Sequence, residues 1–189
     1  QDLLAEIRDL MELPAREKGL DFVIECDPNL PPSFYTDPMR LRQCILNLVS
    51  NAVKFTEKGH ITIRVSLQSR AGQDRVRFEV EDTGMGIERE KQDLIFDSFT
   101  QADHSTCRQF GGTGLGLAIT RRLIGLLGGH IELTSEPGAG STFSLILPLF
   151  LEPNQTSSES LMTEGTESVE TDNRHIGCIG NILLIENKA

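Results

Sequence analysis

The sequence NLVSNAVKFT at residues 47–56, with two glycine-rich stretches that follow it, decides the expected fold of this chain. The glycine-rich stretches are DTGMG at residues 82–86 and GGTGLGL at residues 111–117. In this order the three segments predict a pocket for Mg-ATP. They do not fit two better-known nucleotide motifs. No lysine follows a glycine cluster as a P-loop requires, and Ile119 stands where the dinucleotide fingerprint needs its third glycine.

The first segment lies in a predicted helix that begins at Asp37-Pro38, a good N-cap followed by a good first helical residue, and runs to about Thr56. Its apolar stripe, at helical spacing, consists of Leu41, Cys44, Ile45, Leu48, Val49 and Ala52. Asn47, Asn51 and Lys54 share a different face. An amide oxygen there can bind Mg²⁺ while Lys54 meets a phosphate. The alternative is that these three side chains form a solvated face.

The stretch 82–86 follows a predicted strand, so its carboxylate can accept from the amino group of adenine while Gly84 and Gly86 allow close backbone approach. The alternative is an ordinary strand-to-turn aspartate. The stretch 111–116 opens a helix, where backbone N–H groups favour phosphate, unless it is only a hinge. The long polar segment 98–110 is expected to be a lid or disordered. Arg108 within it can reach a terminal phosphate or remain solvated.

Periodicity and turn residues outline one α/β domain over residues 1–150. Strands are expected at 20–26, 60–68, 75–81, 130–135 and 141–147. Besides the helix from Pro38, helices are expected from Leu3 to Pro14 or soon after it, near 91–96 and at 115–127. The pairs 60–68/75–81 and 130–135/141–147 are predicted hairpins. The expected architecture is a two-layer α/β sandwich, with a mixed, mostly antiparallel sheet and helices on one face.

Residues 151–180 are rich in Ser, Thr, Glu, Asn and Gly, which predicts an acidic disordered linker. The apolar run at 181–185 then predicts the first strand of a further domain that the chain does not contain. The chain begins without Met, in the middle of a predicted helix, and we therefore expect it to be a piece of a longer protein.

Charge and composition exclude some classes of function. The net charge is −10 and there is no basic stripe, which argues against nucleic-acid binding. The four cysteines are isolated from one another, as suits the cytoplasm. No run approaches 18 apolar residues, so no membrane span is expected within the chain.

The residues of these segments, in this order, resemble the four sequence motifs (boxes) of the sensor histidine kinases, and most closely those of the hybrid type. The boxes are Asn47-x-x-x-Asn51-Ala52-x-Lys54-Phe55-Thr56, Asp82-Thr83-Gly84-x-Gly86-Ile87, Phe96-x-x-Phe99 and Gly111-Gly112-Thr113-Gly114-Leu115-Gly116-Leu117. The resemblance implies a Bergerat-type ATP-binding fold, with ATP and Mg²⁺ as cofactors. The tail 182–188 resembles the first strand of a receiver domain, although Asn187 stands where a second acid is usual.

The resemblance also implies roles for single residues. Asn51 would bind Mg²⁺, Asn47 would neighbour the phosphates and Lys54 would contact one. Asp82 would bind adenine and Thr142 would lie near the base. Arg108 would sit in the lid. The residues implied in shaping the base loop, and in anchoring or hinging the lid, are Gly84, Gly86, Phe96, Phe99, Gly112, Thr113, Gly114, Leu115 and Gly116.

Two departures bear on the reaction. Hydrolytic relatives carry a Glu four residues before the metal-binding Asn; Asn47 stands there and cannot act as a general base. None of the histidines (His60, His104, His130 and His175) lies in the family's phospho-acceptor motif. The acceptor is therefore expected on an upstream dimerisation domain.

The sequence thus predicts the ATP-binding catalytic domain of a hybrid histidine kinase, which transfers the γ-phosphate to a histidine outside this chain. The fragment is expected to be monomeric, the parent protein a homodimer, and a receiver domain to follow. Membrane anchoring of the parent, through segments outside this chain, is left open. The alternatives are a Ser-directed kinase of the same fold, such as an anti-sigma factor, and a non-catalytic nucleotide-binding module.

Overall fold

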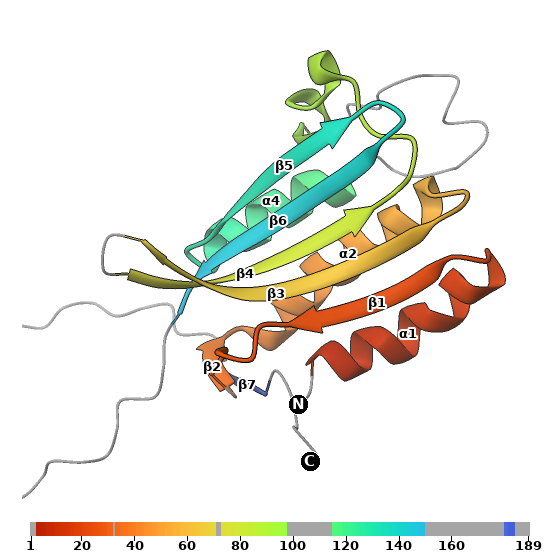
Figure 1. The fold of residues 1–189 in the computed structure, drawn as a ribbon. Helices are drawn as coiled ribbons and strands as arrows, with labels where there is room; N and C mark the ends of the chain where they lie inside the picture. Colours follow the sequence, from red (N-terminus) through yellow and green to blue (C-terminus); the bar gives the residue numbers. More distant parts are fainter. Residues whose placement is uncertain (1–2, 32, 71–72, 98–114, 150–179, 184–189) are drawn as a thin grey trace, which may run out of the picture.

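The computed structural model describes residues 3–31, 33–70, 73–97, 115–149 and 180–183. Five strands form one sheet in the order β1-β3-β4-β6-β5 (Figure 1). Their bounds are β1 Asp21–Cys26, β3 His60–Arg70, β4 Gln73–Asp82, β5 His130–Glu136 and β6 Gly140–Pro148. β1 pairs in parallel with β3, and the other pairs are antiparallel. The predicted mixed, mostly antiparallel sheet and its two hairpins are confirmed.

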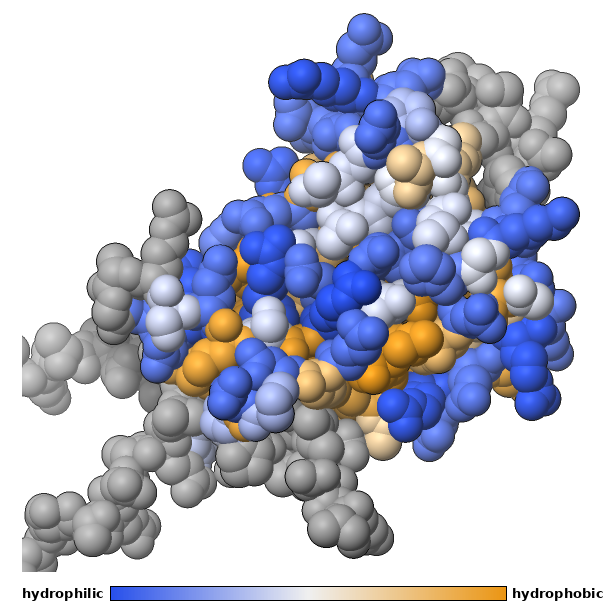
Figure 2. All heavy atoms as spheres, in the orientation of Figure 1, coloured by the Kyte–Doolittle hydropathy of each residue, from blue (hydrophilic) through white to orange (hydrophobic). Residues whose placement is uncertain are grey.

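Among the described residues, three helices cover one face of this sheet (Figure 1). They are α1 Leu3–Glu17, α2 Pro38–Phe55 and α4 Gly116–Leu126. The strand residues facing them are apolar and buried: Ile61, Ile63, Val65, Val76, Phe78, Val80, Phe143, Leu145 and Leu147. The opposite face, seen in Figure 2, is mainly hydrophilic. The predicted two-layer α/β sandwich is therefore confirmed.

The helix ends follow the sequence signals. Asp37 is the N-cap of α2, and its Oδ1 accepts from the backbone N–H of Arg40 at 3.1 Å. Gly128 follows α4 with φ of +75°, and the N–H of Gly129 returns to the carbonyl of Ile124 at 2.9 Å. These caps fix where α2 starts and where α4 ends, and so which residues of the two helices point into the space between them.

α1 ends at Glu17, soon after Pro14 as expected, and it accommodates Pro14 because Ala15 is buried in the core and the helix loses only one late N–H. The structure differs from the sequence-based expectation elsewhere. Two 3₁₀ helices, η1 Arg89–Lys91 and η2 Leu94–Phe96, replace the single predicted helix. β2 Ser33–Thr36 was not expected, and it pairs antiparallel with β7 Gly180–Leu183. The predicted C-terminal strand thus exists, but here it pairs with β2.

Among the described helices, none is both long enough and apolar enough to cross a membrane.

Candidate functional site

The centre of the candidate site is Asp82, the last residue of β4, which is only 7% exposed. Its Oδ1 accepts from the N–H of Gly84 at 2.8 Å. Burial raises the pKa of this carboxyl above its ordinary value, and the N–H groups of Gly84 and Ser141 act in the opposite direction. A buried carboxylate at a strand end, held by backbone N–H groups, is suited to accept a hydrogen bond from a polar group of a ligand.

The two glycines after Asp82 are required by close backbone contacts. A Cβ on Gly84 would lie 2.6 Å from the carbonyl oxygen of Phe55, at the end of α2. Gly86 has a φ of +69°, and its Cβ would lie 2.0 Å from the carbonyl oxygen of Glu136. The sequence prediction that these glycines shape the loop is consistent with this geometry. The loop is held between α2 on one side and the β5–β6 turn on the other.

Ser141, and not Thr142, shares the face of Asp82. Asp82 is directly opposite Ser141 in the β4–β6 register, whereas Thr142 is opposite Glu81. Directly opposed residues project to the same side of a sheet, and neighbours along a strand project to opposite sides. Thr142 therefore lies on the outer face, away from Asp82. The expectation that Thr142 lies near the base is wrong by one residue, and Ser141, which is 7% exposed, is the missed residue.

Asn47 joins α2 to α4. Its Nδ2 donates to the hydroxyl of Thr120 at 2.9 Å. A Cβ on Gly116 would lie 2.4 Å from its Oδ1, so the first turn of α4 passes directly over this amide. The alternative that Asn47 belongs to a solvated face is therefore excluded. Asn51 and Lys54, on the same side of α2, are half-buried, and the ammonium of Lys54 lies 4.9 Å from the ring centroid of Phe55.

Phe96 ends η2 and packs between β6 and α4. Its ring meets Phe143 edge-on, with centroids 6.4 Å apart, and the guanidinium of Arg121 lies 5.8 Å from its centroid. Leu115 immediately precedes α4, and its carbonyl accepts from the N–H of Ile119 at 2.9 Å. The other predicted lid and hinge residues, Phe99, Arg108, Gly112, Thr113 and Gly114, lie outside the described residues.

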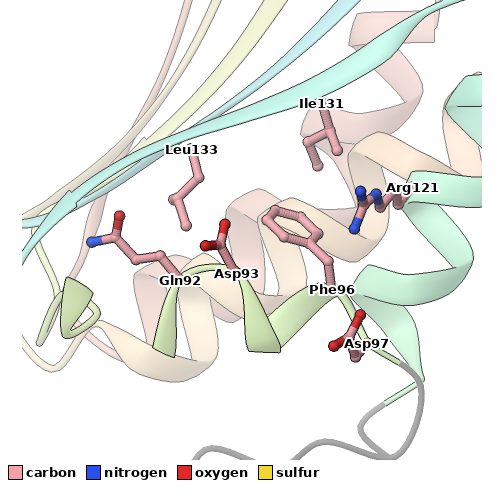
Figure 3. A pocket seen from close by; sticks show the side chains of 7 residues that line it. All are labelled: Gln92, Asp93, Phe96, Asp97, Arg121, Ile131 and Leu133. Carbon is pink, nitrogen blue, oxygen red and sulfur yellow. The ribbon is translucent and has the colours of Figure 1, made fainter. Parts of the chain in front are cut away.

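A separate cavity of about 450 Å³ adjoins Phe96 (Figure 3). It is lined by Gln92, Asp93, Phe96, Asp97, Arg121, Ile131 and Leu133. Figure 3 shows that these side chains come from the η1–η2 segment, from α4 and from β5. Asp82 is not among them, and of the predicted site residues that the structure describes, Phe96 alone lines the cavity.

The two described histidines both lie on the outer face of the sheet. His60 is 3.7 Å from Glu81, and His130 is 3.4 Å from Glu132, at partly exposed positions. The register places His60 next to Ile61, the partner of Asp82, and therefore on the other side of the sheet. Neither side chain can act within the site around Asp82, as their sequence context indicated.

Comparison with known proteins agrees with this geometry. Hybrid signal transduction histidine kinase B of Dictyostelium discoideum is 42% identical over 167 residues, which are 85% of this chain and 8% of that protein. The aerobic respiration control sensor protein ArcB of Escherichia coli is 40% identical over 97% of this chain and 22% of its own length. The chain thus spans less than a quarter of the length of these relatives.

Solved structures share the fold. The full-length ShkA structure in complex with AMPPNP matches with a TM-score of 0.68 and 38% identity, covering 78% of this chain and 29% of that one. The catalytic domain of histidine kinase ThkA matches with a TM-score of 0.65 and 31% identity, covering 79% of this chain and 93% of that one.

One sheet, one helix layer and a buried carboxylate at the end of β4 define a two-layer α/β domain of the GHKL ATPase class. The chain belongs to the histidine kinase-, DNA gyrase B- and HSP90-like ATPase family, whose model matches residues 36–151. Its relatives identify it further as a histidine kinase ATP-binding catalytic domain of two-component signal transduction.

Proposed function

We propose that this domain binds Mg-ATP and donates the γ-phosphate to a histidine on a preceding dimerisation domain. The observation that carries the proposal is the buried carboxylate of Asp82, which accepts from the N–H of Gly84 and lies directly opposite Ser141 in the sheet. This arrangement suits the exocyclic amino group of adenine, which needs an acceptor in a narrow, water-poor slot. The AMPPNP in the ShkA complex supports the same class of ligand.

The residues present fit a magnesium ion that arrives with its nucleotide. Within the described residues, no group of three or more His, Cys, Asp and Glu side chains is arranged to hold a metal ion. Mg²⁺ needs few protein ligands when phosphate oxygens and water complete its shell. We assign Asn51 as its ligand and Lys54 and Arg108 as phosphate contacts. When bound, the ion would neutralise charge on the transferring phosphate.

Asn47 favours phosphoryl transfer over hydrolysis. An amide cannot remove a proton from water, and the Nδ2 of Asn47 already donates to Thr120. The nucleophile must therefore bring its own reactivity, as an imidazole nitrogen does. This chain then contributes binding, orientation and charge stabilisation, which supply most of the catalysis in phosphoryl transfer.

Calorimetric titration with ADP and AMPPNP, with and without Mg²⁺, tests the binding step. We expect saturable binding that Mg²⁺ strengthens for AMPPNP and that Asp82→Asn abolishes. Absence of binding to a folded wild-type chain would refute the proposal. Phosphoryl transfer is then tested by adding the parent protein's helical dimerisation domain with ATP. Phosphate that is acid-labile and alkali-stable indicates phosphohistidine, acid-stable phosphate indicates a Ser-directed kinase, and no transfer indicates a binding module.

The remaining features of the parent protein are part of this proposal. We assign residues 151–180 to a linker and the tail to the start of a receiver domain. We further propose a homodimeric parent, a monomeric fragment, a cytoplasmic location for this domain and no nucleic-acid partner. The hybrid kinases among its relatives support the phospho-acceptor and receiver domains.

A further inference from the structure

The side chain of Lys18 extends from the turn after α1 to the C-terminal end of α2. The residue lies in the turn between α1 and β1, where its N–H bonds to the carbonyl of Ala15 at 3.1 Å. Its Nζ donates to the carbonyls of Val53 at 2.7 Å and Lys54 at 3.0 Å, and reaches that of Thr56 at 3.5 Å. These carbonyls are 35 to 38 residues away in sequence.

The ammonium of Lys18 supplies hydrogen-bond donors and a positive charge at the C-terminal end of α2. The last carbonyls of a helix have no intrahelical donor, and they form the negative end of the helix dipole. The carbonyl of Ala52 accepts from the backbone N–H of Thr56 at 3.0 Å, and the next two carbonyls, those of Val53 and Lys54, accept from Lys18. The carbonyl of Phe55 faces Gly84.

The same helical turn carries the candidate site. Asn51 and Lys54 lie on it, and Phe55 presses its carbonyl against Gly84, whose N–H binds Asp82. The position of this last turn therefore sets where Asn51 and Lys54 lie and how closely Phe55 approaches the Asp82–Gly84 loop. A displacement of the turn would therefore move both Asn51 and Lys54 and the contact with Gly84 at the same time.

We propose that Lys18 is a positioning residue for nucleotide binding, which holds the last turn of α2 against the Asp82–Gly84 loop. This inference rests on the proposed function. Lys18 need not touch the nucleotide, and it acts through the carbonyls of α2.

The test compares Lys18→Met and Lys18→Arg with Lys58→Met, which removes the same charge from an exposed neighbouring turn. The proposal requires that Lys18→Met weaken AMPPNP binding in Mg²⁺ by about tenfold, the order expected for losing hydrogen bonds to a charged donor. Lys18→Arg should restore most of the affinity, and Lys58→Met should bind as the wild type does. Wild-type affinity in folded Lys18→Met would overturn the proposal, and so would an equal loss in Lys58→Met.

An amide NMR spectrum separates positioning from general stability and from failure of the proposed function. Without nucleotide, the N–H resonance of Gly84 should shift in Lys18→Met, while that of Gly128, which donates to the carbonyl of Gly125 at the C-terminal end of α4, stays in place. If Lys18→Met does not fold, the same spectrum of the milder Lys18→Gln variant, which loses the charge but keeps a polar side chain, gives the answer. An unmoved Gly84 resonance overturns the inference. Failure of the wild type to bind nucleotide would instead refute the proposed function and with it the role of Lys18 in nucleotide binding, whatever the Gly84 resonance shows.

Discussion

Asp82 and Ser141 are directly opposed across the β4–β6 ladder, and both side chains are buried on the helix-covered face. Residues 59 positions apart are thus brought to one spot by strand register, while Thr142, one residue on, faces the other way. This relationship separates two adjacent positions that look equivalent in sequence.

The first prediction concerns this pair of neighbours. Ser141→Val adds bulk beside Asp82 and should weaken AMPPNP binding by about tenfold, within the range of about 1–3 kcal/mol that overpacking costs. Thr142→Val, on the outer face, should leave the affinity within about twofold. Titration calorimetry of both variants measures the difference. An equal effect of the two substitutions would contradict the assigned faces.

Asp82→Asn should separate ligand binding from stability. Loss of the charged acceptor should lower nucleotide affinity by about 100-fold or more. Because burial raises the pKa of this carboxyl in the folded state, ionised Asp82 destabilises the fold at neutral pH, and this cost disappears as pH falls below the carboxyl's unfolded pKa.

The unliganded Asn variant should therefore gain unfolding free energy relative to the wild type at pH 7 to 8, with a gain that shrinks towards pH 4. Urea titrations of both proteins across this range measure it. A gain that grows as the pH falls would show that the pKa is lowered, not raised.

Gly86→Ala should destabilise the whole domain. The new Cβ meets the Glu136 carbonyl in a left-handed backbone conformation, and we expect a loss of about 2–3 kcal/mol. Gly138→Ala is the matched control, since Gly138 has a φ of +79° but nothing within 4 Å of its Cβ position. Its cost should stay near 1 kcal/mol, the price of the left-handed conformation alone. Thermal unfolding of both variants tests whether the contact with Glu136 adds to the strain.

Asn51→Ala should remove the effect of Mg²⁺ and spare the base site. We expect AMPPNP affinity in Mg²⁺ to fall to about the value measured in EDTA, because the substitution removes the assigned protein ligand. Affinity for ADP without metal should change by less than about threefold, since Asp82 and its loop are untouched. Retained enhancement by Mg²⁺ in this variant would place the ion's ligand elsewhere.

Much of the fold could be predicted because its elements repeat regular patterns. The alternation of Val76, Phe78 and Val80 predicts a half-buried strand, and the Asp37 cap with its apolar stripe predicts α2. β2 was missed because four residues beside prolines carry too little pattern to separate a strand from a loop. The 3₁₀ turns at 89–96 were read as one helix because both forms bring residues three apart together.

The site was predicted less completely than the fold. The boxes predict a loop shaped by Gly84 and Gly86 after Asp82, and the close backbone contacts of both glycines are consistent with that prediction. The boxes do not show on which side of β6 Thr142 lies. Phe143, Leu145 and Leu147 already mark the inner face, and the same period includes Ser141. Lys18 could not be found from sequence, because no local pattern links a turn lysine to a helix end 35 residues away.

The parallel pairing of β1 and β3 has a mechanical consequence for this enzyme domain. Parallel strands require a crossover, and α2 forms it, with only residues 56–59 between its end and β3. A helix held so closely by the central sheet cannot swing as a separate body. In mechanical terms α2 is the stationary wall of the proposed nucleotide site, and any opening or closing belongs to the elements that face it.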